Sequence, residues 1–264
     1  MLQHVLECAH SAAQILLQHF NQPHAVRIKE SPSSIVTEAD LASDQYIRDY
    51  IQQRFPDHNV LTEESGFINR RSQYTWIADP LDGTSNFAAG LSWFGVMISL
   101  LDNGLPTAAA MVLPAEELVY TAELGKGALK NGKPTSVSTA QSLDQILCAV
   151  GMDAHEQPEA ALTQGKTLAR IAQKVRNVRC TNSLVDFACT IDGRLGGIVN
   201  FNCMVWDIAA PLLILSEGGG HLSDLHGKPV QLSLDEQACQ RSYAIVGAPP
   251  QLHHQLTQLT STSS

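Results

Sequence analysis

The chain has 264 residues, of which 44% are hydrophobic and 16% charged, and its mean hydropathy is -0.05. These values are ordinary for a globular protein and argue against intrinsic disorder. The formal net charge of -9 disfavours nucleic-acid binding, which draws on basic surface. The apolar runs are too short to span a membrane, and the N-terminus does not resemble a signal peptide. We therefore expect a cytoplasmic protein with neither a membrane nor a nucleic-acid partner.

The six cysteines form no Cys-x-x-Cys pair and show no zinc-ligand spacing with histidine. We expect them to be reduced and mostly buried, and we do not expect zinc. If an acidic chain binds a phosphorylated substrate, the positive charge must come from something other than a large basic surface. A bound divalent cation would supply it.

The first half of the chain predicts two helices followed by strands. Residues 2–20 have the spacing of an amphipathic helix. A second helix is expected to run from Thr37 to about residue 55, with Asp40 at the capping-box position. Strands are expected at 74–78, 94–101, 107–113 and 118–122. Because short turns join these strands, the sequence predicts an antiparallel sheet.

Beyond residue 137 strands and helices alternate, which is typical of α/β organisation. The expected elements are a strand at 146–150, helices at 158–174 and 182–192, a strand at 198–201 and a helix at 207–216. We therefore place a soft boundary between residues 1–137 and 138–264. The two halves are expected to form one structural unit and to share one site.

Two aspartates follow the expected strand at 74–78. Asp79 comes directly after apolar residues, and Asp82 follows three residues later. Carboxylates are costly at the end of a buried strand unless their charge is compensated. Pro80 is expected to turn the chain, so that both aspartates converge with the Leu81 carbonyl between them. Such oxygen ligands suit Mg²⁺, Mn²⁺ or Ca²⁺. The alternative is a turn in which the two aspartates cap the following segment.

Further acidic residues lie at two other places in the chain. Glu63 and Glu64 lie at the end of a short apolar stretch, and Asp207 follows a tryptophan at the start of an apolar segment. Asp207 is either a helix N-cap or another metal carboxylate. Glu64 is expected to be structural or to lie behind the ligands. The glycines at 218–220 are expected to end the helix that starts at Asp207.

Four segments, taken together, resemble the signatures of the inositol monophosphatase family, in its order and spacing. They are Thr37-Glu38-Ala39-Asp40, Glu63-Glu64-Ser65, Asp79-Pro80-Leu81-Asp82-Gly83-Thr84-Ser85-Asn86-Phe87 and Trp206-Asp207-Ile208-Ala209-Ala210. The likeness extends from about Leu2 to Pro249. It implies an α+β fold, the layered αβαβα sandwich shared with fructose bisphosphatase. It also implies a homodimer, dependence on Mg²⁺ and inhibition by Li⁺.

The resemblance assigns roles to individual residues. Two or three Mg²⁺ ions are held by Glu63, Asp79, Asp82, Asp207 and the Leu81 carbonyl. The catalytic residues are Glu63, Thr84 and Asp40. The residues that bind substrate are Asp82, Gly83, Thr84, Asn182, Ser183, Asn200 and Asp207. Asp40 has two possible roles, capping the helix that begins after Thr37 or holding the Thr84 hydroxyl that orients the attacking water. Lys29 matches a basic residue near the metals.

The sequence departs from the family pattern where substrate would bind. Thr181-Asn182-Ser183 replaces a glycine, a small residue and alanine, and Asn200 replaces a glutamate that binds substrate hydroxyls. Pro211 replaces a glycine and is expected in the first turn of its helix, where the missing N–H costs little. Because Asn200 brings no charge, the polyol contacts must differ. We therefore do not expect myo-inositol monophosphate to be the substrate.

The expected function is Mg²⁺-dependent hydrolysis, by metal-activated water, of a phosphate monoester of a small polyol or sugar-like metabolite. No nucleophile elbow or cysteine-phosphatase loop is apparent, so no covalent protein intermediate is expected. Alternative substrates are histidinol phosphate, fructose bisphosphate and adenosine bisphosphate. A different alternative is a regulatory protein that binds partners, because some bacterial relatives bind transcription machinery. A structural Ca²⁺ module is disfavoured, because there is no EF-hand spacing.

Overall fold

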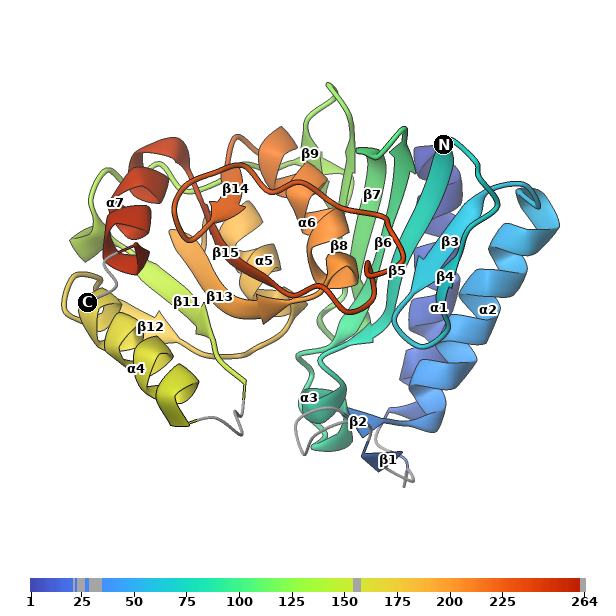
Figure 1. Ribbon diagram of the computed structural model, residues 1–264, viewed down its shortest axis with the longest axis horizontal. Coiled ribbons are helices and arrows are strands. Elements are labelled where there is room, and N and C mark those ends of the chain that lie inside the picture. Colours follow the sequence, from blue (N-terminus) through green and yellow to red (C-terminus); the bar gives the residue numbers. More distant parts are fainter. Residues whose placement is uncertain (21, 23–26, 29–34, 154–157, 262–264) are drawn as a thin grey trace.

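The computed structural model describes residues 1–20, 22, 27–28, 35–153 and 158–261. Its elements form five layers in the order helices, sheet, helices, sheet, helices (Figure 1). The αβαβα arrangement predicted from the sequence is therefore confirmed. A separate two-stranded ribbon is made by β1 (Arg27–Ile28) and β2 (Ile35–Val36).

The larger sheet has eight strands in the order β10-β9-β8-β7-β6-β5-β3-β4. Their bounds are β3 (Asn59–Thr62), β4 (Gly66–Ile68), β5 (Tyr74–Asp82), β6 (Gly95–Asp102), β7 (Leu105–Leu113), β8 (Leu118–Glu123), β9 (Ala128–Lys130) and β10 (Lys133–Pro134). The sheet is antiparallel as expected, except that β3 and β5 are parallel. The exception arises because β4 pairs antiparallel with β3 on its far side. The chain therefore passes back over β3 and enters β5 in the direction of β3.

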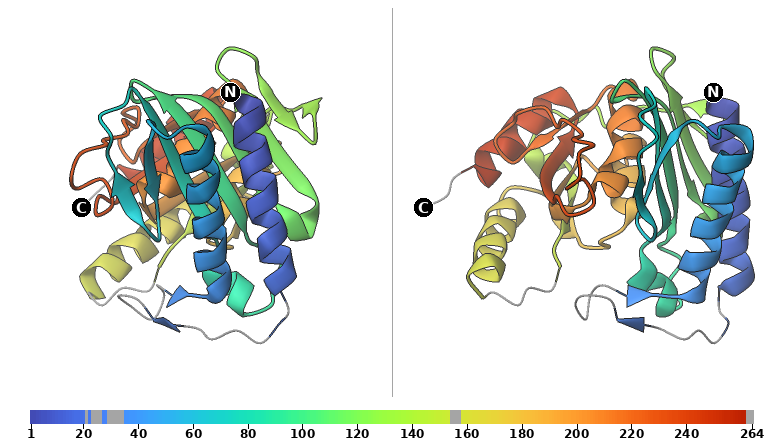
Figure 2. Two further views of the ribbon diagram at one scale, coloured as in Figure 1. Left: turned by 90° about the vertical axis from the view of Figure 1, so that its right-hand side faces the viewer. Right: turned by 45° about the vertical axis from the view of Figure 1, so that its right-hand side comes forward.

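Two long helices cover the outer face of this sheet, α1 (Leu2–His19) and α2 (Glu38–Arg54). Figure 2 shows them lying along the strands on the same side of the sheet. Their apolar faces and the sheet bury one core, which includes Leu16, Ile47 and Trp76. Thr37 caps α2 together with Asp40, as the sequence predicts. This capping fixes Asp40 at the end of α2 that faces β5.

The smaller sheet has five strands in the order β12-β11-β13-β15-β14. Their bounds are β11 (Leu147–Gly151), β12 (Asn177–Arg179), β13 (Gly197–Cys203), β14 (His221–Asp224) and β15 (Tyr243–Ala248). Strand β11 runs parallel to both β12 and β13. Helices α5 (Leu184–Ile191) and α6 (Val205–Glu217) fill the space between the two sheets, while α4 (Pro158–Ala172) and α7 (Pro250–Thr260) cover the far face (Figure 1).

Each large sheet falls on one side of residue 137, since the larger spans residues 59–134 and the smaller spans 147–248. On this ground we propose that the chain has two halves that meet near that residue. The middle helices α5 and α6 belong to the second half but also contact the sheet of the first. The two halves therefore share a continuous interior.

Helices α5 and α6 begin at residues other than those predicted. Helix α5 starts at Leu184 rather than Asn182, because Asn182 has a left-handed backbone with φ of 52°. Helix α6 starts at Val205, two residues before Asp207. Pro211 therefore lies inside α6 and not in its first turn, so the carbonyl of Asp207 cannot receive the usual helical N–H. The helix ends at Gly218 as expected.

Strand β5 continues through Pro80 instead of turning there. Asp79 pairs with Met97 on β6 and Asp82 pairs with Gly95, so three steps on β5 match two on β6. This extra residue is a β-bulge. In a regular strand, residues three apart point to opposite faces, but one inserted residue restores them to the same face. The bulge, rather than a proline turn, therefore brings Asp79 and Asp82 together.

Within the described part of the chain, no helix has the length and apolarity needed to cross a bilayer. The six cysteines are not joined by disulfides in the structure. Cys8, Cys148 and Cys203 are buried, whereas Cys180 is exposed.

The close approach of β7 and α5 should make Gly95 intolerant of a side chain. A Cβ at this residue would lie 2.1 Å from the carbonyl oxygen of Val112 and 2.8 Å from Leu184 Cδ1. We expect Gly95→Ala to lower the free energy of unfolding by at least about 1–3 kcal/mol, because the backbone must shift. In α4, a Cβ at Gly165 would meet nothing within 4 Å. Gly165→Ala should therefore raise stability by about 0.5–1 kcal/mol. Urea denaturation measures both, and equal stabilities would contradict this account.

Candidate metal centre and active site

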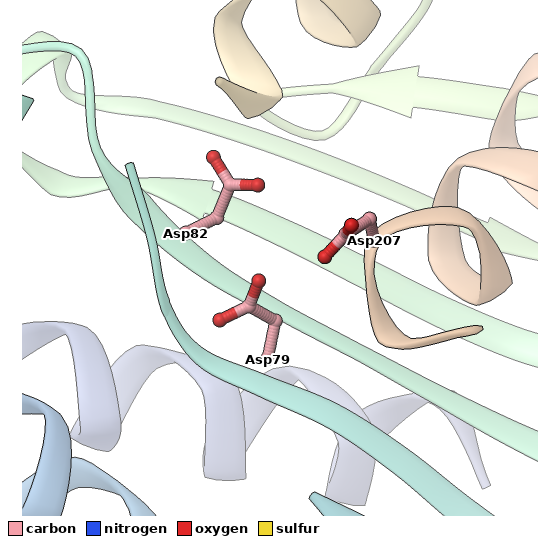
Figure 3. Close-up of side chains that lie close together, drawn as sticks. All are labelled: Asp79, Asp82 and Asp207. Atoms are coloured by element: carbon pink, nitrogen blue, oxygen red, sulfur yellow. The ribbon is translucent and has the colours of Figure 1, made fainter. Parts of the chain in front are cut away.

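Three aspartates from two layers converge on one point. Asp79 and Asp82 lie on either side of the bulge in β5, and Asp207 lies in the first turn of α6. One carboxylate oxygen of each lies within 4.8 Å of the others. Figure 3 shows the three side chains pointing toward a common centre. This cluster confirms that the three aspartates identified in the sequence meet in space.

A backbone N–H fixes the orientation of each aspartate. The N–H of Leu81 donates to Asp79 Oδ1 at 3.0 Å, and that of Leu184, at the start of α5, donates to Asp82 Oδ1 at 2.5 Å. The N–H of Met204 donates to Asp207 Oδ2 at 2.6 Å. Asp207 is therefore the third residue of α6 and not its N-cap. Each carboxylate keeps a second oxygen for other ligands.

Burial, and secondly nearby negative charge, opposes the ionisation of these carboxylates. Burial raises the pKa of Asp79 well above its usual range, and the charges of Glu63, Asp82 and Asp207 raise it further. Burial also raises the pKa of Asp82 to about 7, although the Leu184 N–H acts against this. The pKa of Asp207 is raised mainly by burial and next by the charge of Asp82. A cation at the centre would remove the repulsion.

Thr84 lies beside the cluster, at the start of the short helix α3 (Thr84–Ala88). Its hydroxyl is 3.0 Å from Asp40 Oδ1 and 3.0 Å from the Leu81 carbonyl oxygen. The other oxygen of Asp40 accepts the Thr37 N–H at 2.8 Å and the Thr37 hydroxyl at 2.5 Å. Asp40 therefore makes both the capping contact to Thr37 and the contact to the Thr84 hydroxyl, one on each carboxylate oxygen. Asp40 is 1% exposed, so its position is rigidly set by these contacts.

The aspartates line a cavity of about 590 Å³. The predicted site residues that line it are Glu63, Asp79, Leu81, Asp82, Gly83, Thr84, Asn182, Ser183, Asn200 and Asp207. Thr181 also lines it. Asp40 does not, because it lies behind Thr84. Lys29, which was matched to a basic residue near the metals, lies outside the described residues.

Several residues of the cavity were not expected from the sequence. They are Ser85, Asn86, Asp153, Phe187, Asn202, Cys203, Met204, Trp206 and Cys239. Asp153 could have been found, because it follows the expected strand at 146–150, whose carboxyl end lies beside that of its parallel neighbour β13. Cys239 lies far from any recognisable motif, so sequence reasoning had no signal for it.

The donor set fits a hard divalent cation. The three groups that converge are carboxylates, with ligand oxygens within 4.8 Å of one another, although the Cys203 and Cys239 thiols also line the cavity. Mg²⁺ prefers such ligands, whereas zinc and softer metals prefer nitrogen and sulfur. The raised pKa values of Asp79 and Asp207 show that burial disfavours these charges unless a cation offsets them. Fold and site together define a layered α+β protein with a cluster of three carboxylates that could hold a divalent cation.

Comparison with known proteins gives the family. A model of the inositol monophosphatase family matches residues 1–264, and the chain belongs to this family. The chain is similar to a protein named Nus factor SuhB from Escherichia coli strain K12, with 32% identity over 230 residues, or 86% of each chain. It is also similar to an inositol-1-monophosphatase from Synechocystis sp., with 30% identity over 262 residues, or 97% of this chain and 87% of that protein.

Solved structures agree with this assignment. The crystal structure of the extragenic suppressor protein suhB from Bartonella henselae superposes with a TM-score of 0.89 and 26% identity, covering 99% of this chain and 98% of the other. An IMPase/NADP phosphatase crystallised with Mg²⁺ and phosphate superposes with a TM-score of 0.82, covering 98% of this chain and 95% of the other. At 20% identity, the second likeness shows the fold alone.

The carboxylate cluster should make the stability of the metal-free protein depend on pH. The folded pKa of Asp82 is about 7, against an ordinary value of 3.8, so the folded state holds more protons than the unfolded state between these values. Stability contributed by this group is therefore lost as pH rises from about 4 to about 7. Bound Mg²⁺ should cancel the loss, so the increase in Tm caused by Mg²⁺ should grow over this interval.

Thermal unfolding in EDTA and in excess Mg²⁺, repeated across this pH range, measures the effect. The pKa values of some other carboxyls shift in the opposite direction. Burial acts to raise the pKa of Asp192, but hydrogen bonds from Arg194 and Lys130 lower it below its ordinary value. The difference between the two conditions cancels such groups. In Asp82→Asn the growth with pH should be smaller, because one of the crowded carboxyls is gone. Equal Tm values in EDTA and in excess Mg²⁺ near neutral pH would contradict a metal site here.

Proposed function

We propose that this protein is a Mg²⁺-dependent phosphoric monoester hydrolase that acts on a small phosphorylated metabolite. The observation that carries the proposal is the meeting of Asp79, Asp82 and Asp207 beside the Thr84 hydroxyl in one cavity. Membership of the inositol monophosphatase family supports it. So does the similarity to an inositol-1-monophosphatase from Synechocystis sp..

In this proposal the metal ligands are the carboxylates of Glu63, Asp79, Asp82 and Asp207 and the carbonyl of Leu81. They would hold two or three Mg²⁺ ions. Bound Mg²⁺ supplies the positive charge that stabilises the transition state of phosphate ester hydrolysis and activates water. The backbone N–H groups that donate to the three aspartates keep the carboxylates oriented in the absence of metal.

Thr84 and Asp40 would position the attacking water. The Thr84 hydroxyl has one hydrogen, and both Asp40 Oδ1 and the Leu81 carbonyl oxygen lie 3.0 Å from it as acceptors. Once that hydrogen is engaged, the Thr84 oxygen faces other groups as an acceptor. A water that donates to it would have its lone pair directed elsewhere, toward the phosphorus atom. Glu63, which lines the same cavity, is the proposed acceptor of the proton of the water.

The first turn of α3 would contact the phosphate. Gly83 precedes α3 with a left-handed backbone, φ 80°, and a Cβ there would lie 2.5 Å from the Trp93 carbonyl oxygen. Only glycine therefore allows the chain to turn this sharply beside Asp82. Gly83 and Thr84 both line the cavity, and in this proposal their backbone N–H groups would donate to phosphate oxygens.

A regulatory role through protein partners is a second candidate, because relatives of this chain are named Nus factor SuhB. The complete set of proposed metal ligands favours an enzyme, since a purely regulatory protein has no need to retain it. We also propose a cytoplasmic homodimer that is inhibited by Li⁺ and does not bind nucleic acid. These properties follow from the family resemblance and from the acidic net charge of -9.

Phosphate release across a panel of phosphorylated metabolites in Mg²⁺ tests the proposed activity. The panel includes inositol, histidinol, fructose and adenosine phosphates. Asp82→Asn should lower kcat/KM by more than about 100-fold, because it removes one charged ligand of the metal. Its Tm in EDTA should not fall, since a crowded charge is removed. Near-normal turnover in Asp82→Asn would overturn the metal assignment, and silence of the wild type across the panel, with Mg²⁺ bound, would favour the regulatory role.

The role of the Thr84 hydroxyl can be tested separately from metal binding. Thr84→Val keeps the shape of the side chain and removes the hydroxyl, so kcat should fall about 10²-fold while the Mg²⁺-induced rise in Tm persists. Thr84→Ser is the matched control, because it restores the hydroxyl. It should retain most of the activity. Equal kcat values for Thr84→Val and wild type would show that this hydroxyl does not position the water.

A further inference from the structure

A fifth carboxylate, Asp153, lines the same cavity as the aspartate cluster. Asp153 follows β11 and accepts a hydrogen bond on each oxygen, from Asn182 Nδ2 at 2.7 Å and from Asn202 Nδ2 at 2.9 Å. These three residues come from segments far apart in the sequence. Each asparagine donates one amide hydrogen to the same carboxylate, so both side chains are oriented toward Asp153. The arrangement fixes the direction in which Asp153 faces.

The surrounding backbone is shaped to hold this group. Gly151 pairs with Asn200 across the parallel strands β11 and β13. A Cβ on Gly151 would lie 2.5 Å from Asn200 Nδ2 and 2.9 Å from Asn182 Oδ1. The Asn200 oxygen accepts the N–H of Asn202 at 3.0 Å. The lack of a side chain at Gly151 therefore lets the amides of Asn200 and Asn182 lie close against β11.

Asn182 also adopts an unfavourable backbone conformation. Its φ of 52° lies in the left-handed region, which asparagine tolerates better than most residues. Such conformations cost free energy and are retained where surrounding contacts hold them. Here the Asn182 N–H is directed to Asp186 at 3.2 Å while its amide reaches Asp153. Two contacts therefore stabilise this strained residue at the wall of the cavity.

The charges in the cavity limit what can enter it beside the phosphate. Its described lining includes five acidic residues and no lysine, arginine or histidine. Four of the five are proposed metal ligands, so their charges are offset by Mg²⁺. Asp153 is not among those ligands, and its nearest printed partners are neutral amides. A second phosphate or a carboxylate beside Asp153 would be repelled by its negative charge. None of the described lining residues offers a positive charge to offset that repulsion.

We propose that Asp153, positioned by Asn182 and Asn202, accepts hydrogen bonds from the alcohol portion of the substrate. The proposal rests on the phosphatase function above and specifies its substrate class. A carboxylate offers about four acceptor positions, and the two amides use two of them. The remaining positions select a phosphate monoester whose other groups are hydroxyls or amines. Esters that carry a second anionic group are disfavoured by repulsion.

Relative substrate preference in the full-length protein with Mg²⁺ tests this proposal. The donor-bearing probes are inositol 1-phosphate and histidinol phosphate, and p-nitrophenyl phosphate is the reference without such donors. In Asp153→Ala, the ratio of kcat/KM for the preferred donor-bearing probe to that for the reference should fall about 10–100-fold. Asp49→Ala is the matched control, because Asp49 is an exposed residue of α2 that bonds only to Gln45 among its printed hydrogen bonds. Its ratio should equal that of wild type.

Charge and hydrogen bonding at residue 153 can be separated with further probes. Fructose 1,6-bisphosphate and 3-phosphoglycerate carry a second anionic group, so their kcat/KM relative to the reference should rise in Asp153→Ala. Asp153→Asn keeps an acceptor oxygen but loses the charge. If kcat/KM falls more for histidinol phosphate than for inositol 1-phosphate in this variant, the group that Asp153 binds is an amine. A similar reduction for both would identify a polyol.

Asn202→Ala tests the positioning role. It should shift the same preference ratio in the same direction as Asp153→Ala but by less, because Asn182 still holds the carboxylate. A merely structural role would lower the Tm and leave the ratio unchanged. A wild-type preference for 3-phosphoglycerate, or an unchanged ratio in folded Asp153→Ala, would overturn the proposal.

The failure of this proposal can be distinguished from failure of the phosphatase function. If wild type hydrolyses none of the probes, including the reference, the phosphatase function fails. Calorimetric binding of inositol 1-phosphate, histidinol phosphate and phenyl phosphate to the Mg²⁺-loaded protein then still tests Asp153. A loss of selectivity for a donor-bearing ester in Asp153→Ala would support the proposed contact, and equal selectivity in both proteins would overturn it.

Discussion

The cost of burying three clustered carboxylates, first by loss of water and then by repulsion between charges, is the constraint on which the site depends. Asp79, Asp82 and Asp207 lie within 4.8 Å of one another, and burial raises the pKa of each. Such an arrangement is costly without a cation, so a chain that retains it has a use for one. The cost is limited by three backbone N–H groups, each from a different segment. These donors come from β5, α5 and the turn before α6, and the cluster therefore depends on how the two sheets and the middle helices pack.

The bulge in β5 connects the fold to the chemistry. Its inserted residue places Asp79 and Asp82 on one face of the sheet, toward α6, and exposes the Leu81 carbonyl to Thr84. The same segment then turns at Gly83 into α3. The proposed metal ligands, the hydroxyl proposed to position water and the N–H groups proposed to bind phosphate thus follow one another within six residues of the chain, 79–84. Close spacing in sequence makes their relative positions insensitive to motions between the two halves.

Much of this could be predicted from the sequence, because its signals are local. Helical periodicity, the capping box at Thr37 and Asp40 and the apolar run before Asp79 depend on neighbouring residues, and the structure confirms each. The bulge, the parallel pairing of β3 with β5 and the true start of α6 depend on partners distant in sequence. Pro80 was therefore interpreted as a turn, and Pro211 as a residue of the first helical turn. A proline restricts φ in both settings, so its local signal does not distinguish them.

The substrate end of the cavity shows the same limit more strongly. Asn200 replaces a glutamate in the family pattern, which from sequence alone looks like the loss of a carboxylate. The structure places Asp153 in the same cavity, held by Asn182 and Asn202. A carboxylate that reaches the cavity from β11 rather than β13 can still accept hydrogen bonds from a hydroxylated substrate, but from another direction. Loss of one side chain from a motif is therefore weak grounds for inferring loss of recognition. In the proposed phosphatase, the position of the acceptor, rather than its presence, would then determine which hydroxyl or amine is selected.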